Sequence, residues 1–108
     1  MAFKVFLTED AALDLAEIRD YIAAHDAAEK ADYVLGQIQA VIESLAEFPE
    51  RGAYPRELLA LGSRDYREVF FKPYRILYRA IGDCIYVYLI ADGRRDLHSL
   101  LQRRLVQT

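Results

Sequence analysis

The sequence predicts an α+β fold, in which an N-terminal strand and an antiparallel helical hairpin pack on an antiparallel sheet with a three-stranded meander, followed by a short C-terminal helix. Two observations carry this prediction. Apolar residues recur at helical spacing in the first half of the chain, and apolar and polar residues alternate in the second half. With 108 residues, of which 54% are hydrophobic and 29% charged, the chain can build one core, so we expect a single domain over residues 1–108.

The first expected element is a short strand over residues 3–7, followed by a helix. Thr8 is expected to cap that helix, because its hydroxyl can accept a hydrogen bond from an N–H of the first turn. Glu9 and Asp10 lie in this turn, where their charge suits the positive end of the helix dipole. The helix is expected to end near Ala24.

A second helix is expected to begin at Asp26, with Glu29 three residues further on in a capping-box arrangement. Apolar residues at helical spacing form a stripe along this helix, and such a stripe normally faces a core. The short link between the two helices predicts an antiparallel hairpin on the apolar face of the sheet. The stripe comprises Ala31, Val34, Leu35, Ile38, Val41, Ile42 and Leu45.

The stretch from Tyr66 to Leu97 predicts the three-stranded meander. A two-residue hairpin loop at Gly82 and Asp83 gives the pairs Ile81–Cys84, Ala80–Ile85, Tyr78–Val87 and Ile76–Leu89. A turn centred on Lys72 and Pro73 gives the pairs Phe70–Arg75, Glu68–Leu77 and Tyr66–Arg79. One face then carries Tyr74, Ile76, Tyr78, Ala80, Ile85, Val87 and Leu89, and the other carries Arg75, Leu77, Arg79, Tyr86, Tyr88 and Ile90.

The second of these faces is the predicted partner-binding surface. Arginine and tyrosine anchor contacts with proteins and nucleic acids, so we predict that Arg75, Arg79, Tyr86 and Tyr88 bind a partner. The alternative is that Glu68, which is diagonal to both arginines, pairs with them and neutralises the face.

A helical turn is expected over residues 58–61, and a closing helix over residues 97–105. The closing helix has one apolar face, formed by Leu97, Leu100, Leu101 and Leu105. Arg103 and Arg104 lie away from that face, and together with Arg94 and Arg95 they form the most basic local surface, which we predict to bind a partner. The alternative, which applies mainly to Arg103 and Arg104, is that they only favour the helix C-terminus and keep the chain soluble.

The charge of the chain is unevenly distributed. Residues 1–62 carry 5 basic and 12 acidic side chains, and residues 63–108 carry 9 basic and 5 acidic ones, so a net charge of -7 is followed by one of +4. The acidic half is explained by helices that solvate themselves with Asp and Glu. The basic half is explained by an acidic partner surface, and both explanations can hold together.

The sequence contains few residues that could carry chemistry. We expect no cofactor and no metal, because one cysteine and two histidines are too few for a structural zinc site and no phosphate-binding or hydrolase motif is present. Cys84 is interpreted as a packing residue and His25 as a solvated loop residue. His98 is either a general base for RNA cleavage or a helix-surface histidine without a task. We expect no membrane contact and a cytoplasmic protein, because there is neither a bilayer-spanning apolar run nor a secretory signal.

Three segments, in this order, resemble the RelE/ParE superfamily of bacterial toxins from toxin–antitoxin modules. They are Phe48-Pro49-Glu50-Arg51-Gly52, Tyr74-Arg75-Ile76-Leu77-Tyr78-Arg79 and Gly93-Arg94-Arg95-Asp96-Leu97. The similarity covers essentially the whole chain. It implies a compact toxin that a co-expressed antitoxin neutralises.

The superfamily divides into RelE-like ribosome-dependent mRNA endonucleases and ParE-like inhibitors of DNA gyrase. The RelE-like arginines match Arg75 and Arg95 of this chain, but the two RelE-like lysines fall on Tyr66 and Glu68, or with a one-residue gap on Arg67 and Val69, and the terminal tyrosine falls on Leu101. RNA cleavage then lacks its proton-transfer and charge-stabilising groups.

The resemblance therefore favours a ParE-like toxin that binds gyrase, is masked by a ParD-like antitoxin and makes no direct sequence-specific contact with nucleic acid. The alternatives are a RelE-like endonuclease that uses Arg75, Arg95 and His98, and an inert member that binds only its antitoxin.

Overall fold

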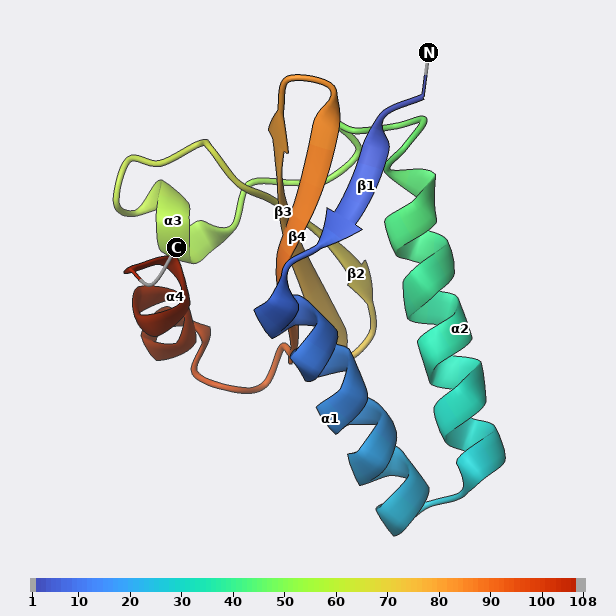
Figure 1. Ribbon diagram of the computed structural model, residues 1–108. Coiled ribbons are helices and arrows are strands. Elements are labelled where there is room, and N and C mark those ends of the chain that lie inside the picture. The colour runs from blue at the N-terminus through green and yellow to red at the C-terminus, as the bar shows by residue number, and fades with distance from the viewer. Residues whose placement is uncertain (1, 107–108) are drawn as a thin grey trace.

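The computed structural model describes residues 2–106 and contains a four-stranded sheet in the order β1-β4-β3-β2. Its strands are β1 (Lys4–Leu7), β2 (Arg67–Phe71), β3 (Tyr74–Ile81) and β4 (Cys84–Asp92), and its helices are α1 (Glu9–His25), α2 (Ala28–Ser44), α3 (Arg56–Leu59) and α4 (Leu97–Val106). Helices α1 and α2 cover one face of the sheet, and α3 and α4 lie together on the other side (Figure 1). We call these the hairpin face and the second face. None of the helices described is long and apolar enough to cross a bilayer.

The N-terminal strand makes the sheet mixed, whereas the sequence predicts an antiparallel one. β1 pairs parallel with β4, so that Lys4 lies opposite Cys84 and Leu7 opposite Val87. The antiparallel meander β2-β3-β4 is as predicted. A parallel neighbour can be reached only through a long connection, and here α1, α2 and the meander separate β1 from β4.

The ends of the helical hairpin confirm one predicted cap and correct another. The Thr8 hydroxyl accepts a hydrogen bond from Ala11 N at 3.1 Å, as expected of an N-cap. The predicted capping box of Asp26 and Glu29 is wrong, because Ala27 is the N-cap of α2 and makes no side-chain cap bond. Asp26 instead completes α1, since its N–H donates to Ile22 O.

The predicted pairing of β3 with β4 is correct from Ile81–Cys84 to Tyr78–Val87 and then shifts by one residue. A bulge at Tyr88 places Leu77 opposite Leu89 and Ile76 opposite Ile90. The shift exchanges the two faces for the end of β4. Ile90 therefore joins the core under the hairpin and Leu89 joins the cluster on the second face, the reverse of the prediction.

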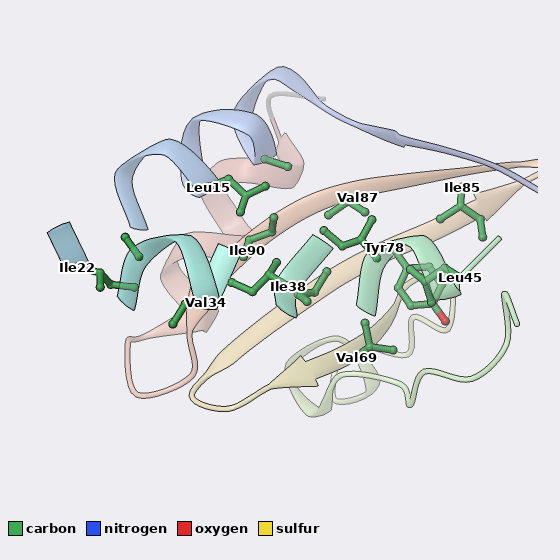
Figure 2. Close-up of a cluster of buried hydrophobic side chains, with 14 residues drawn as sticks. Leu15, Ile22, Val34, Ile38, Leu45, Val69, Tyr78, Ile85, Val87 and Ile90 are labelled. Atoms are coloured by element: carbon green, nitrogen blue, oxygen red, sulfur yellow. The ribbon is translucent and has the colours of Figure 1, made fainter. Parts of the chain in front are cut away.

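The main core lies between the hairpin and the sheet (Figure 2). It includes the predicted stripe of α2 and most of the predicted apolar positions of β3 and β4, and Ile38, Ile76, Tyr78 and Ile85 are fully buried in it. Burying such side chains contributes about 1.5–3 kcal/mol each. Of the predicted positions, Leu89 lies in the cluster on the second face and Ala80 is exposed.

The loop after α2 is tied to this core by a tyrosine. The Tyr78 hydroxyl donates to Pro49 O at 2.7 Å and accepts from Gly52 N at 3.1 Å. A Cβ atom at Gly52 would lie 2.7 Å from Glu68 O and 2.8 Å from the same hydroxyl, so only glycine fits. This contact gives a structural reason for the Phe-Pro-Glu-Arg-Gly segment.

A second apolar cluster holds α3 and α4 against the second face. Its buried members are Leu58, Leu77, Leu89, Ala91, Leu97 and Leu101. The predicted leucine face of the closing helix is confirmed, with Leu97 and Leu101 buried and Leu100 and Leu105 packed beside them. The helical turn predicted over residues 58–61 lies slightly earlier, at Arg56–Leu59.

Candidate partner-binding site

The part of the second face that α3 and α4 leave open carries a row of aromatic rings and one arginine, which we call the aromatic row. It consists of Phe6, Tyr66, Arg79, Tyr86 and Tyr88. Phe6 and Tyr86 are neighbours across β1 and β4, and their rings stack with centroids 5.7 Å apart. The Arg79 guanidinium lies 5.5 Å from the Tyr66 ring, which meets Tyr88 edge-on at 5.5 Å. These contacts align rings from β1, from β4 and from the residue before β2 on one surface, together with Arg79 of β3.

The aromatic row presents apolar area together with a positive charge. Phe6 is 45% exposed, and the other four members are half-buried. The neighbouring Cys84 thiol raises the pKa of the Tyr86 phenol, so this ring is neutral at physiological pH. Such a surface can bind a partner through ring contacts and through one guanidinium.

Arg75 occupies the same face of β3 but is held by two carboxylates. Its Nε donates to Glu68 at 2.6 Å, and its two terminal nitrogens donate to both oxygens of Glu57 at 2.8 Å. The arginine is 8% exposed and Glu68 is 5% exposed. The hydrogen bonds from Arg75 lower the pKa of Glu57 from 4.5 to about 2, and those carboxylates raise the pKa of Arg75. Glu57 and Arg75 are therefore both charged, and Arg75, held by two carboxylates, is not free for a partner.

This arrangement confirms half of the alternative in which Glu68 neutralises the face. Glu68 pairs with Arg75, whereas Arg79 lies over Tyr66. Glu57, which lies on α3 and supplies the bidentate contact, was not predicted as a partner of Arg75.

Arg94 and Arg95 line a cleft of about 340 Å³ between α1 and the end of β4. Arg94 pairs with Asp92 and lowers the pKa of that carboxyl, yet its side chain is 80% exposed. The Arg95 side chain has no partner among the residues described. Tyr21 and Tyr74 form the walls, and burial raises the pKa of Tyr74. The cleft thus offers two accessible guanidinium groups beside two rings.

The structure separates Arg103 and Arg104, which the sequence places together on an exposed side. Arg103 is exposed. Arg104 is half-buried and binds both oxygens of Asp14, at 2.8 and 3.0 Å, and the Tyr88 carbonyl at 2.8 Å. Asp14 and Asp10 raise the pKa of Arg104. The predicted availability of Arg104 is therefore corrected, because this side chain fastens α4 to α1 and β4.

The candidate nuclease residues do not line one common cleft. Arg75 is enclosed by Glu57 and Glu68, Arg95 lines the cleft beside α1, and His98 lines a separate hollow of about 260 Å³ between α3 and α4.

The positions that correspond to the RelE-like lysines also lack free cations. Of these, Glu68 is paired, Val69 is buried, Tyr66 lies beneath Arg79, and Arg67 donates to Gly52 O and the Tyr54 hydroxyl. Leu101, which takes the position of the RelE-like terminal tyrosine, is buried.

Comparisons with known proteins agree with this architecture. The model of the ParE toxin family, described as the ParE toxin of the type II toxin–antitoxin system parDE, matches residues 5–97. A structure of the chromosomal ParDE system from P. aeruginosa is similar with a TM-score of 0.71 and 23% identity, covering 84% of this chain and 96% of that one. A mutant of the E. coli toxin RelE in the free state is similar with a TM-score of 0.67 and 15% identity, covering 99% of this chain and 98% of that one.

No curated protein sequence gives a significant match. The family match runs from the second residue of β1 to the first residue of α4 and so reaches all four strands of the sheet. The chain belongs to the ParE toxin family of type II toxin–antitoxin systems.

Proposed function

We propose that this chain is a cytoplasmic toxin that inhibits DNA gyrase by binding it, and that a cognate ParD-like antitoxin neutralises it. The membership of the ParE family supports the toxin–antitoxin context. The observation that carries the choice of a binding mechanism is the state of Arg75. An arginine already held by two carboxylates cannot stabilise the charge that develops on a phosphate during RNA cleavage.

The aromatic row suits an antitoxin segment that is acidic and amphipathic. Its rings offer apolar contact area, and Arg79 offers a charge for a carboxylate. A disordered acidic segment can wrap such a surface and fold on binding, while opposite charges steer its approach. We assign the antitoxin to this face.

The arginine surface of Arg94, Arg95 and Arg103 suits the second partner. These three side chains are exposed, and they lie in the basic half of the chain. We assign gyrase binding to this surface. Arg104 is excluded from it because its guanidinium is committed to Asp14.

A DNA supercoiling assay tests the target. The wild-type chain should inhibit gyrase, and the variant Arg94→Ala/Arg95→Ala should lose most of this inhibition while its circular dichroism spectrum stays unchanged. The matched control is Arg19→Ala/Lys30→Ala, which removes two exposed cations from the helical hairpin and should inhibit like wild type. A wild type without effect on gyrase would refute the target. A folded arginine variant with full activity would refute only the surface.

The competing mechanism has its own test. The purified chain should leave mRNA intact on translating ribosomes. Codon-positioned cleavage that disappears in Arg95→Ala would establish the nuclease instead.

A further inference from the structure

The sheet has three stretches of edge, and the chain caps two of them. On the outer edge of β2, Glu68 exchanges both backbone hydrogen bonds with Ala53, at 2.7 and 3.0 Å. Between Glu68 and the turn, Phe70 is then the one residue of β2 whose backbone groups point outward. On β4 beyond its pairing with β1, Asp14 accepts from Ile90 N at 3.0 Å and Arg104 donates to Tyr88 O at 2.8 Å. Side chains and loops of this kind protect an edge from pairing with another chain.

The outer edge of β1 has no such cap. Lys4 N donates to Asp83 O and Thr8 N donates to Val87 O, so the even-numbered residues of this strand bond to β4. The backbone groups of Val5 and Leu7 consequently point away from the sheet, and neither N–H has a partner among the residues described. The open stretch begins after Phe3, whose N–H donates to Ala46 O at 2.8 Å.

The side chains along this edge are self-complementary. In an antiparallel pairing of two β1 strands about Phe6, Val5 of one copy would exchange hydrogen bonds with Leu7 of the other, giving four new bonds. The two Phe6 rings would lie opposite each other on the second face, as close neighbours in a pair without hydrogen bonds. Phe6 and Leu7 are 45% and 39% exposed, so both contribute apolar area that is open in the single chain.

Charge also matches in this register. Lys4 would lie opposite Thr8 of the second copy, beside Glu9 in the first turn of α1. Both Lys4 and Glu9 are exposed, and neither side chain has a partner in the part of the chain described. The two-fold axis would place Lys4 of each copy near Glu9 of the other, which gives two equivalent ion pairs.

We propose that the outer edge of β1 is a homodimer interface, through which two copies form one continuous eight-stranded sheet. The axis is perpendicular to the sheet, so the helical hairpins of both copies lie on one side. The two aromatic rows become a single surface that passes through Phe6 of each copy. This proposal does not depend on the antitoxin or on gyrase.

Proline substitution at Val5 tests the interface, because it removes an edge N–H and keeps an apolar side chain where Val5 packs against the main core. Val5→Pro removes an N–H that points out of the sheet, and proline is tolerated at such an edge position. Two of the four bonds of the dimer would be lost, so the dissociation constant measured by sedimentation equilibrium should rise about tenfold or more. The control is Phe6→Pro, whose N–H faces β4, and which should lower the melting temperature of the single chain.

A charge swap tests the register. Lys4→Glu and Glu9→Lys should each weaken the dimer, and the double variant Lys4→Glu/Glu9→Lys should restore it. Phe6→Ala should also weaken it, whereas Leu61→Ala, at a 68% exposed site after α3, should have no effect. A wild type that stays monomeric at all concentrations would overturn the proposal, as would a dimer that Val5→Pro leaves intact. Dimerisation without rescue by the charge swap would overturn the register.

Discussion

Arg75 and Arg79 lie four residues apart on β3 and face the same side of the sheet, yet their surroundings differ completely. Arg75 lies where α3 meets the sheet, and its guanidinium is fixed by Glu57 and Glu68. Arg79 lies where the sheet is open, over an aromatic ring. The covered half of the second face thus uses its arginine for folding, and the open half leaves its arginine for a partner.

The same division separates the two arginines near the C-terminus. Arg104 joins α4 to Asp14, whereas Arg103 next to it is exposed. Residue type alone therefore does not identify a binding residue in this chain. The presence within reach of a carboxylate that is largely shielded from solvent decides whether an arginine is structural.

The largest expected effect is that of Arg75→Ala on stability. The substitution leaves the 5%-exposed Glu68 without its cation, which costs about 3–5 kcal/mol. Urea unfolding monitored by circular dichroism measures this loss. Arg75→Ala/Glu68→Gln/Glu57→Gln should recover part of it, because no unpaired carboxylate then remains at this site. An Arg75→Ala variant as stable as wild type would contradict the division between the two halves.

The next effect is a pH dependence carried by Glu57. Its pKa falls from 4.5 to about 2 on folding, so its contribution to stability is present above pH 4.5 and is lost as the pH falls toward 2. The contribution is at most about 3 kcal/mol. Glu57→Gln should therefore be less stable than wild type at pH 7, and the gap in the free energy of unfolding should narrow between pH 4.5 and 2. The control Glu43→Gln, at an exposed site on α2, should follow the wild-type profile. A gap independent of pH would contradict the ion pair.

Much of this division could be predicted from the sequence, because the signals are local. The alternation along β3 places Arg75 and Arg79 correctly on one face. The turn residues give the correct pairing of β3 with β4 from Ile81–Cys84 to Tyr78–Val87. The bulge at Tyr88 was missed because no glycine or other local residue marks it.

The partners of the arginines could not be predicted. Asp14 is 90 residues away from Arg104 in sequence, and Glu57 is 18 residues away from Arg75 on a helix whose docking depends on the second apolar cluster. Phe6 was missed as a member of the aromatic row for the same reason, since the parallel pairing of β1 with β4 is a long-range contact. The one signal that could have found it is that Phe6 lies two residues after Lys4 in the strand, and so on the same side of it as this charged residue.

A smaller effect is expected for the clamp between α1 and α4. Asp14→Ala removes the acceptor for Ile90 N and leaves Arg104 without its bidentate carboxylate, at a cost of about 2 kcal/mol. Chemical unfolding measures this cost, and limited proteolysis should show faster cleavage within α4. Asp20→Ala, whose side chain is 78% exposed on the same helix, should change neither result. Equal proteolysis of wild type and Asp14→Ala would show that the leucine face alone holds α4.

The smallest effect on stability is expected for Arg79→Ala, and it completes the comparison with Arg75. Arg79 is half-buried, and among the residues described its guanidinium interacts with the Tyr66 ring and with no carboxylate, so its loss should change the free energy of unfolding by less than about 1 kcal/mol. If the aromatic row binds the antitoxin, the same change should weaken that complex by at least tenfold in a calorimetric titration, because it removes the only arginine of the row. Glu43→Lys changes charge on the outer side of α2 and is the matched control, with unaltered affinity. An Arg79→Ala variant that is stable and binds antitoxin as tightly as Glu43→Lys would remove the open half of the second face from the antitoxin interface, while a strongly destabilised one would mean that both arginines of β3 serve the fold.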